Sequence, residues 1–328
     1  MWCGIQGHDA NVERFRRSAQ RGRLAGTFLF AGTAGVGKRM FAFALAQGIL
    51  CKGNGGRSIE PCGTCDSCKL FGTQPPSHPD LYYVCKPADK ASLPLELLVG
   101  DKKSGGRAGL CADIYRTPFL GHRKVAILDD ADYLSESGAS AANVMLKTLE
   151  EPPPDAVIIL IGTSASKQLP TIRSRCQIVR FAPLPLKILA TLLAKNEAVE
   201  TLEQGLKLAR RAEGSYDQAL ELYDDAVDGT FQQFCKQLAQ KNFDAVANAA
   251  KINELIDGAG KESPLKRRRL RLFLHLSVHH FREVMKSKPA TDFRPAMRML
   301  EQTLDALAQI DRNAALPVIV ENWCSRLK

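Results

Sequence analysis

Long apolar runs are absent from this sequence. The longest candidate, VIILI at residues 157–161, is far shorter than the roughly 18 residues that a membrane-spanning helix needs. The first residues, MWCGIQGHDANVERFRR, turn polar at once and lack the apolar core of a secretory signal. Internal repeats and low-complexity tracts are absent as well. We therefore expect a soluble cytoplasmic protein that makes no contact with a membrane.

The net charge and the cysteine content exclude few classes of protein. The 328 residues carry a formal net charge of +10, which suits contact with nucleic acid but equally suits solubility alone. Ten cysteines are present, and inside a cell such residues bind metal or pack as buried thiols more often than they form disulfides. With 45% hydrophobic residues, the chain can build ordinary cores for two or three domains.

Short apolar segments in the first part of the chain predict the strands of a parallel sheet. Apolar segments that are continuous and separated by helical stretches are typical of strands covered on both faces. They are TFLFAG at 27–32, LYYVC at 81–85, KVAILDD at 124–130 and AVIILIGT at 156–163. The expected fold class is therefore α/β, and nearly every later segment has a helical period.

The domain boundaries are expected where this pattern changes. Closely spaced prolines in FAPLPLK, residues 181–187, end the alternation of strands and helices, and we expect a second break at Asp228–Gly229. The expected domains are residues 1–180, a small helical domain at 181–228 and a helical C-terminal domain at 229–328. Residues 86–115 contain no pattern that assigns them a role.

A glycine-rich turn lies between the first expected strand and a helix. The stretch GTAGVGK matches the pattern of a phosphate-binding loop, in which backbone N–H groups cradle phosphates and a lysine adds positive charge. The matching residues are Gly32, Gly35, Gly37 and Lys38. The next position calls for a hydroxyl that binds magnesium, and here it is Arg39. The fixed charge of Arg39 predicts weak nucleotide binding and still weaker hydrolysis.

Two acidic residues follow the apolar segment at 124–130. Asp129 is expected beside the metal ion of such a site, and Asp130 stands where a longer Glu usually polarises the attacking water. Taken alone, the two acids could equally cap the end of a strand and the start of a helix. Together with the glycine-rich turn, they predict a degenerate nucleotide site.

Four cysteines lie close together in CKGNGGRSIEPCGTCDSC. They are Cys51, Cys62, Cys65 and Cys68, and their spacing lets four thiolates surround one tetrahedral zinc ion. Because all four positions would be filled by protein, the site should be structural rather than catalytic. Iron–sulfur ligation and free thiols are the alternatives, although nothing else in the sequence indicates redox chemistry.

Basic and apolar residues are combined in KRRRLRLFLHLSVHHF at residues 266–281. Such a stretch can contact nucleic acid, but it also matches an amphipathic helix with one solvated face. We favour the helix, because a DNA-binding patch usually needs more than one basic turn.

These motifs together resemble the clamp-loader subunits of bacterial DNA polymerase III, which are AAA+ proteins. GTAGVGK, KVAILDDADYL, AANVMLKTLEEPPP and TIRSRC occur in the order seen in that family. The resemblance covers most of residues 1–180 and extends more weakly through Asp228. It is strongest to the delta-prime type, with the gamma/tau motor type second. It implies a P-loop AAA+ domain with a RecA-like sheet and a zinc module at 51–68, a helical lid domain and an all-α collar domain.

The resemblance also assigns roles to single residues. Arg175, in the SRC motif, would be an arginine finger that acts in trans on ATP held by a neighbouring subunit. Thr163 would be a polar residue near the γ-phosphate. Asp217, in GSYDQAL, stands where a motor subunit carries a sensor arginine. Arg39, Asp130 and Asp217 together favour the delta-prime type, which does not hydrolyse ATP.

The function implied by the resemblance is that of a clamp-loader subunit in DNA replication. The chain would carry structural Zn²⁺, bind ATP or ADP weakly or not at all, and belong to the DNA polymerase III holoenzyme without catalysing a reaction by itself. Its partners would be gamma/tau motor and delta subunits and, through them, the sliding clamp and primed DNA. The alternatives are a gamma/tau-type ATPase motor and a loader-like ATPase of recombination or repair. The four-cysteine insertion argues against the latter.

Overall fold

Two compact units make up this chain. The computed structural model describes residues 2–55, 58–73, 75–87, 90, 92–100, 109–136, 139–240, 242–260, 262–287, 294–312 and 314–327. The first unit is Met1–Leu192 with Glu213–Asp217, and the second is Leu193–Ala212 with Gln218–Lys328. The division into three domains expected from the sequence stays a prediction.

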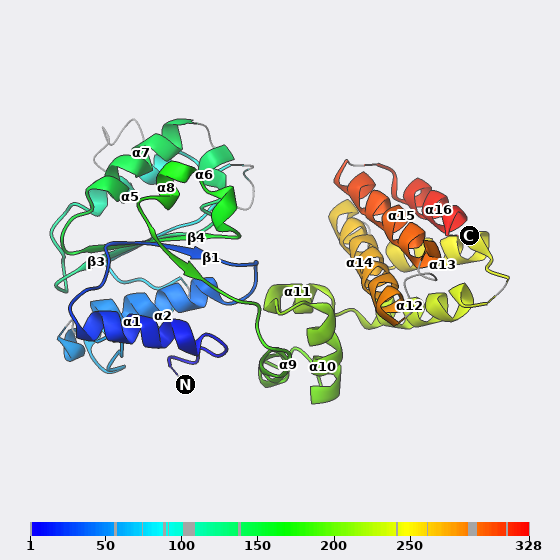
Figure 1. Cartoon of the computed structure of the whole chain (residues 1–328), viewed down its shortest axis with the longest axis horizontal. Helices are drawn as coiled ribbons and strands as arrows, with labels where there is room; N and C mark the ends of the chain where they lie inside the picture. Colours follow the sequence, from blue (N-terminus) through cyan, green and yellow to red (C-terminus); the bar gives the residue numbers. More distant parts are fainter. Residues whose placement is uncertain are drawn as a thin grey trace. The chain divides into compact units, whose positions relative to one another are not determined.

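A five-stranded parallel sheet forms the centre of the first unit (Figure 1). Its strands lie in the order β2-β3-β4-β1-β5. They are β1 (Thr27–Ala31), β2 (Leu81–Val84), β3 (Lys124–Leu128), β4 (Ala156–Gly162) and β5 (Gln177–Arg180). The expected α/β class is confirmed, together with the four strands that apolar segments predicted.

Strand β5 was not predicted from the sequence. It lies at the edge of the sheet and pairs only with β1 among the described strands. Of its four residues QIVR only Val179 is fully buried, so the segment lacks the continuous apolar run that marks the central strands. The SRC motif, residues 174–176, immediately precedes this strand.

Helices cover both faces of the sheet, which explains why nearly all residues of its central strands are apolar. One face carries α1 (Asp9–Gln20) and α2 (Lys38–Leu50), and the other carries α5 (Leu110–Asp113), α6 (Tyr133–Glu136), α7 (Ala139–Glu150) and α8 (Pro170–Arg173) (Figure 1). Every residue of β1, β3 and β4 is buried. Short helices α3 (Asp66–Lys69) and α4 (Glu96–Val99) complete the unit. Within 86–115, residues 88, 89, 91 and 101–108 lie outside the described residues.

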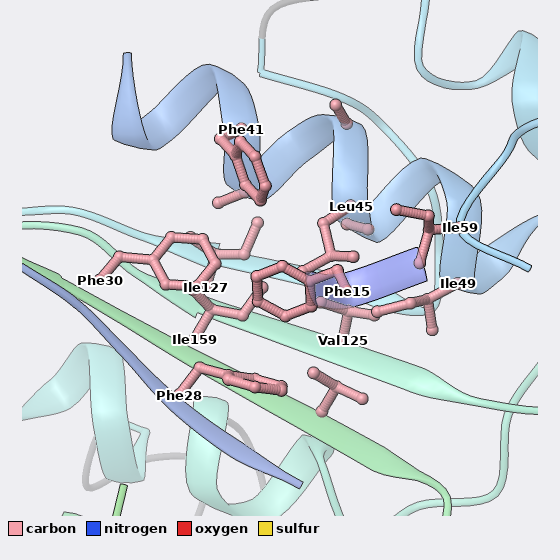
Figure 2. Packing of buried hydrophobic residues seen from close by; sticks show 14 of the residues in the cluster. Phe15, Phe28, Phe30, Phe41, Leu45, Ile49, Ile59, Val125, Ile127 and Ile159 are labelled. Atoms are coloured by element: carbon pink, nitrogen blue, oxygen red, sulfur yellow. The ribbon is translucent and has the colours of Figure 1, made fainter. Parts of the chain in front are cut away.

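Aromatic packing fills the core between α1, α2 and the sheet (Figure 2). Phe41 is fully buried, and its ring centroid lies 5.7 Å from that of Phe15, 5.8 Å from that of Phe30 and 5.1 Å from that of Phe181. Ile59, which lies between the first two cysteines of the cluster, is fully buried in the same core. Burial of such a side chain contributes about 1.5–3 kcal/mol, so Ile59 anchors the cysteine-rich segment to the sheet domain.

Helices alone form the described part of the second unit. They are α10 (Leu202–Arg211), α12 (Asp225–Leu238), α13 (Ala245–Asp257), α14 (Ser263–Ser287), α15 (Arg294–Asp311) and α16 (Leu316–Arg326). Helices α9 (Leu186–Lys195) and α11 (Tyr216–Glu221) contribute residues to both units. The helical character expected after residue 187 is confirmed.

No break in the secondary structure occurs at Asp228–Gly229, because α12 runs through both residues, and the domain boundary expected there stays a prediction. The helix begins earlier, where the Asp224 carboxylate accepts hydrogen bonds from the backbone N–H groups of Ala226 and Val227. Asp228 lies in the first turns of this helix, where a negative charge is favourable, and its carboxylate pairs with Arg211 at 2.7 Å.

The basic stretch at 266–281 lies in α14, and two of its arginines serve the helical unit itself. Arg267 donates to the carbonyl oxygen of Ile310 at 3.1 Å, and Arg269 pairs with the Asp224 carboxylate at 2.9 Å. This use in packing supports the interpretation as a helix rather than a DNA-binding patch. Although α14 has 25 residues, none of the described helices is long and apolar enough to cross a membrane.

Candidate functional site

The glycine-rich turn connects β1 to α2, as a phosphate loop requires. Gly37 has φ 94° and caps the N-terminus of α2, so that Lys38 becomes the first helical residue. Gly32 is required by a close approach of the chain, because a Cβ atom there would lie 2.4 Å from the carbonyl oxygen of Phe181. The backbone therefore has the form of a phosphate loop, and its use by a nucleotide stays a prediction.

The side chain of Lys38 is bonded within the loop. Its ammonium group donates to the carbonyl oxygens of Gly32 and Thr33, both at 2.6 Å. Lys38 is only 7% exposed, and burial lowers its pKa although the charge of Asp129 acts in the opposite direction. A phosphate group would have to replace these carbonyl contacts in order to bind the lysine.

Arg39 and Asp129 form an ion pair across the site. The Nε atom of Arg39 donates to Oδ2 of Asp129, which also accepts from the Tyr83 hydroxyl at 3.3 Å. The other carboxylate oxygen, Oδ1, accepts the backbone N–H of Asp130 at 3.0 Å. Protein donors thus engage both oxygens of the carboxylate that was expected to lie beside magnesium.

Asp130 has a strained backbone beside this ion pair. Its φ of 58° lies in the left-handed region, which few residues other than glycine adopt. Burial raises the pKa of its carboxyl group, and the nearby charge of Asp129 raises it further. Strained residues of this kind cluster at functional positions, but the expected catalytic deficiency of Asp130 is not tested by the geometry.

Thr163 is bonded to Asp132, a residue that sequence reasoning missed. The Asp132 carboxylate accepts the backbone N–H of Thr163 at 2.9 Å, its hydroxyl at 2.5 Å, and the side-chain amide of Gln168 at 2.5 Å. The charge of Asp132 also favours the charged form of Lys38. The signal in the sequence was the third acid of DDADYL, which lies three residues beyond Asp129.

The segment that contains Asp217 packs directly against the phosphate loop. The backbone N–H of Tyr216 donates to the carbonyl oxygen of Gly35 at 2.8 Å. A Cβ atom on Gly35 would lie 2.3 Å from the Ser215 hydroxyl and 2.9 Å from the Cβ atom of Asp217. Asp217 acts electrostatically on Lys38. The position matched to a sensor arginine therefore brings negative charge to the loop.

Arg175 lies at the opposite end of β1 from the phosphate loop. Its carbonyl oxygen accepts the hydroxyl of Thr27, the first residue of β1, at 2.6 Å. Its guanidinium group donates to the carboxylate of Glu150 at 2.5 Å and to the carbonyl oxygen of Thr171 at 2.9 Å. Cys176, which follows it, is buried. The structure therefore brings Lys38, Arg39, Asp129, Asp130 and Thr163 together around the loop and leaves Arg175 apart from them.

The four cysteines meet in one cluster, as their spacing predicted. All four Sγ atoms lie within 4.8 Å of one another, with Cys51 and Cys65 separated by 3.9 Å and Cys62 and Cys68 by 4.0 Å. Zinc bound by four thiolates at about 2.3 Å needs sulfur separations of about 3.8 Å, so the donor set fits. Backbone N–H groups of Cys65 and Thr64 lower the pKa of Cys62 to about 5, which favours the thiolate form that binds metal. The cluster can therefore hold a metal ion.

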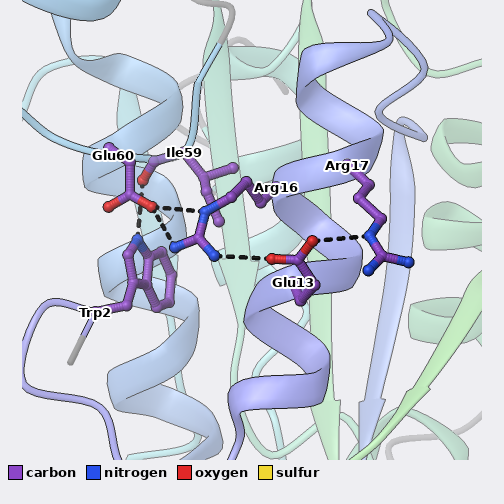
Figure 3. A network of polar contacts seen from close by, with 6 residues as sticks. All are labelled: Trp2, Glu13, Arg16, Arg17, Ile59 and Glu60. Atoms are coloured by element: carbon purple, nitrogen blue, oxygen red, sulfur yellow. Dashed lines mark hydrogen bonds and ion pairs between the residues drawn. The ribbon is translucent and has the colours of Figure 1, made fainter.

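Polar contacts fix the cysteine-rich segment to the N-terminus and to α1 (Figure 3). The indole N–H of Trp2 donates to the carbonyl oxygen of Ile59 at 3.2 Å, and Arg16 pairs with Glu60 at 2.7 Å. On the α2 side, a Cβ atom on Gly48 would lie 2.1 Å from the carbonyl oxygen of Ile59. The segment is thus packed against two helices by contacts that involve none of the four cysteine side chains.

Comparisons with known proteins agree with the motifs. A family model described as "DNA polymerase III, delta subunit" matches residues 7–185. The DNA polymerase III subunit delta' of Pseudomonas aeruginosa is 36% identical over 195 residues, which are 58% of this chain and 54% of that protein. The corresponding subunit of Bacillus subtilis is 34% identical over 180 residues, which are 55% and 49% of the two chains.

The subunit tau of Escherichia coli is also similar, with 33% identity over 230 residues, which are 69% of this chain and 33% of that protein. The matched part of this chain therefore spans about half of each delta-prime relative and a third of the tau relative.

Substitution of Gly35 tests whether the loop is braced by the segment at 213–217. Gly35→Ala should lower the free energy of unfolding by about 2–4 kcal/mol, because the new Cβ overlaps the Ser215 hydroxyl and the backbone has φ 71°. Gly22→Ala is the matched control, since φ is 62° and nothing lies within 4 Å of the new Cβ. It should cost only about 1–2 kcal/mol.

Urea denaturation, followed by Trp2 fluorescence in a Trp323→Phe background, measures both losses in the first unit. Equal losses of unfolding free energy for the two variants would contradict the support of the loop by the segment at 213–217.

Proposed function

This chain belongs to the DNA polymerase III delta subunit family, as a relative of the delta-prime subunits, and from that premise we propose that it lends Arg175 to the ATP site of a neighbouring motor subunit. Its own phosphate loop does not hydrolyse ATP. Its partners are a gamma/tau-type motor and a delta subunit, in an assembly that loads the sliding clamp onto primed DNA during replication.

The observation that carries this proposal is the ion pair between Arg39 and Asp129. ATP hydrolysis depends on a magnesium ion that bridges the phosphates and takes oxygen ligands from the protein. Here the loop hydroxyl is replaced by a guanidinium group, and the Asp129 carboxylate already accepts three protein donors. Magnesium could reach Asp129 only beside the fixed positive charge of Arg39, and this repulsion disfavours the metal site.

The rest of the loop supports weak or absent nucleotide binding. Lys38 is held by the loop's own carbonyl oxygens, and Asp217 adds negative charge near the place where phosphates would bind. The loop instead has a structural role, because Gly35 packs without space against Ser215. A motor subunit of gamma/tau type would need the hydroxyl, the longer acid and the sensor arginine that this chain replaces by Arg39, Asp130 and Asp217.

The setting of Arg175 supports its role as a finger. The Thr27 hydroxyl donates to the carbonyl oxygen of Arg175, and the next residue, Cys176, is buried, so the backbone is fixed. The side chain of Arg175 is 33% exposed. A guanidinium group carried on a rigid backbone can stabilise the charge that develops on phosphoryl oxygens in the transition state.

The cysteine cluster holds a structural zinc ion in this proposal. Cys51, Cys62, Cys65 and Cys68 would each supply one thiolate. Bound zinc supplies a cross-link within the segment, while buried Ile59 ties the same segment to the core.

Metal analysis of the purified chain tests the zinc site. We expect about one equivalent of zinc in the full chain and its loss in Cys65→Ser, because three thiolates bind this metal less tightly than four. Cys3→Ser is the control, since this thiol is exposed and lies outside the cluster, and zinc should be retained. Iron in place of zinc, or no metal in freshly purified protein, would overturn the assignment.

Substitution of Arg175 in a complex reconstituted with a motor subunit tests the finger. Arg175→Ala should lower kcat by about 10³-fold at the site that the finger serves, since arginine fingers contribute on that order. Arg173→Ala is the control, because this arginine is a near neighbour in α8 with no side-chain partner among the described residues, and it should leave kcat unchanged. If Arg175→Ala hydrolyses ATP at the unsubstituted rate, Arg175 is not a finger.

A further inference from the structure

We propose that Glu150 is a latch that holds Arg175 folded against its own subunit until the phosphate of a neighbour's ATP replaces the Glu150 carboxylate. The inference rests on the proposed function, because it concerns the conformation from which Arg175 acts in trans. Glu150 is the last residue of α7, and its Oε1 atom lies 2.5 Å from Nη2 of Arg175.

Three of the five N–H donors of the Arg175 guanidinium are bonded to its own chain. Nη1 donates to the carbonyl oxygen of Thr171 at 2.9 Å and to the Ser174 hydroxyl at 3.3 Å, while Nη2 donates to Glu150. Nε is buried and has no partner in the part of the chain that the structure describes. Of the five N–H donors of an arginine, one on Nη2 is left for another molecule. A phosphoryl group is usually bound by two parallel N–H donors, so this conformation is a stored one.

The stored conformation leaves the buried Nε–H of Arg175 without a hydrogen-bond acceptor among the described residues. A buried donor without an acceptor loses its bond to water and gains none in return, so extension of the side chain would recover that loss. The folded-back side chain is therefore held by its contacts to Glu150, Thr171 and Ser174, and Glu150 provides the charged one.

The backbone around Arg175 does not need to move for release. Its N–H donates to the carbonyl oxygen of Ile172 at 3.1 Å, and its carbonyl oxygen accepts from Thr27 at 2.6 Å. Cys176 is only 8% exposed. Since these contacts fix the main chain, rotation of the Arg175 side chain alone converts the stored conformation into an extended one.

The strength of the latch suits a contact that must open. The side chains of Arg175 and Glu150 are 33% and 48% exposed, and ion pairs at such exposure shift an equilibrium by about two- to fivefold. A terminal phosphate carries more negative charge than a carboxylate and can accept two N–H donors at once, so it can displace Glu150. Glu150 is therefore a positioning residue that acts through Arg175.

The test measures ATP hydrolysis by the chain reconstituted with a motor subunit. Glu150→Gln should raise kcat/KM for ATP by about two- to fivefold, mainly through a lower KM, because the finger no longer has to leave a charged partner. Glu151→Gln is the matched control. It removes the same charge one residue away, from an exposed side chain that forms no ion pair within the described residues, and it should leave kcat/KM unchanged.

A double substitution decides whether Glu150 acts through the finger. In an Arg175→Ala background, Glu150→Gln should have no effect, because the residue that it restrains is gone. A persisting effect in that background would overturn the latch, as would an unchanged or lowered kcat/KM in Glu150→Gln alone. Failure of the proposed function looks different, because Arg175→Ala by itself would then leave hydrolysis intact.

Discussion

In the proposed function, the ion pair between Arg39 and Asp129 limits what the phosphate loop of this protein can do. Asp129 follows β3 and Arg39 lies in the first turn of α2, so the pair joins a central strand to the helix that covers it. The carboxylate that would hold magnesium is engaged by protein donors, and the lysine that would hold phosphate is engaged by loop carbonyls. A nucleotide site whose ligand positions are filled from within can persist as a packing element.

Strand β1 connects the phosphate loop to the backbone of Arg175. Its last residue leads into the phosphate loop, while its first residue, Thr27, fixes the backbone of Arg175. The sheet thus carries the phosphate loop at one end of this strand and Arg175 at the other. In the proposed assembly the first end contributes stability, and the second contributes chemistry to a neighbouring subunit.

Local patterns made much of the fold and site predictable. Continuous apolar segments gave the central strands, the glycine spacing gave the loop, and the cysteine spacing gave the cluster that Cys51 to Cys68 form. Strand β5 was not predicted, because an edge strand needs few apolar residues. The Arg39–Asp129 and Arg175–Glu150 pairs join residues 90 and 25 positions apart, and the role of Asp132 depends on Thr163 beyond the next strand. Such contacts follow from the register of the fold rather than from any nearby pattern.

ATP hydrolysis by the purified chain alone is the most direct test of the central claim. We expect no ATP turnover above background with magnesium, with or without primed DNA. The reason is that the ion pair of Arg39 with Asp129 disfavours magnesium at that carboxylate. The same preparation should stimulate hydrolysis by a motor subunit, which establishes that the chain is folded and competent. Substantial DNA-stimulated turnover by the chain on its own would contradict the account.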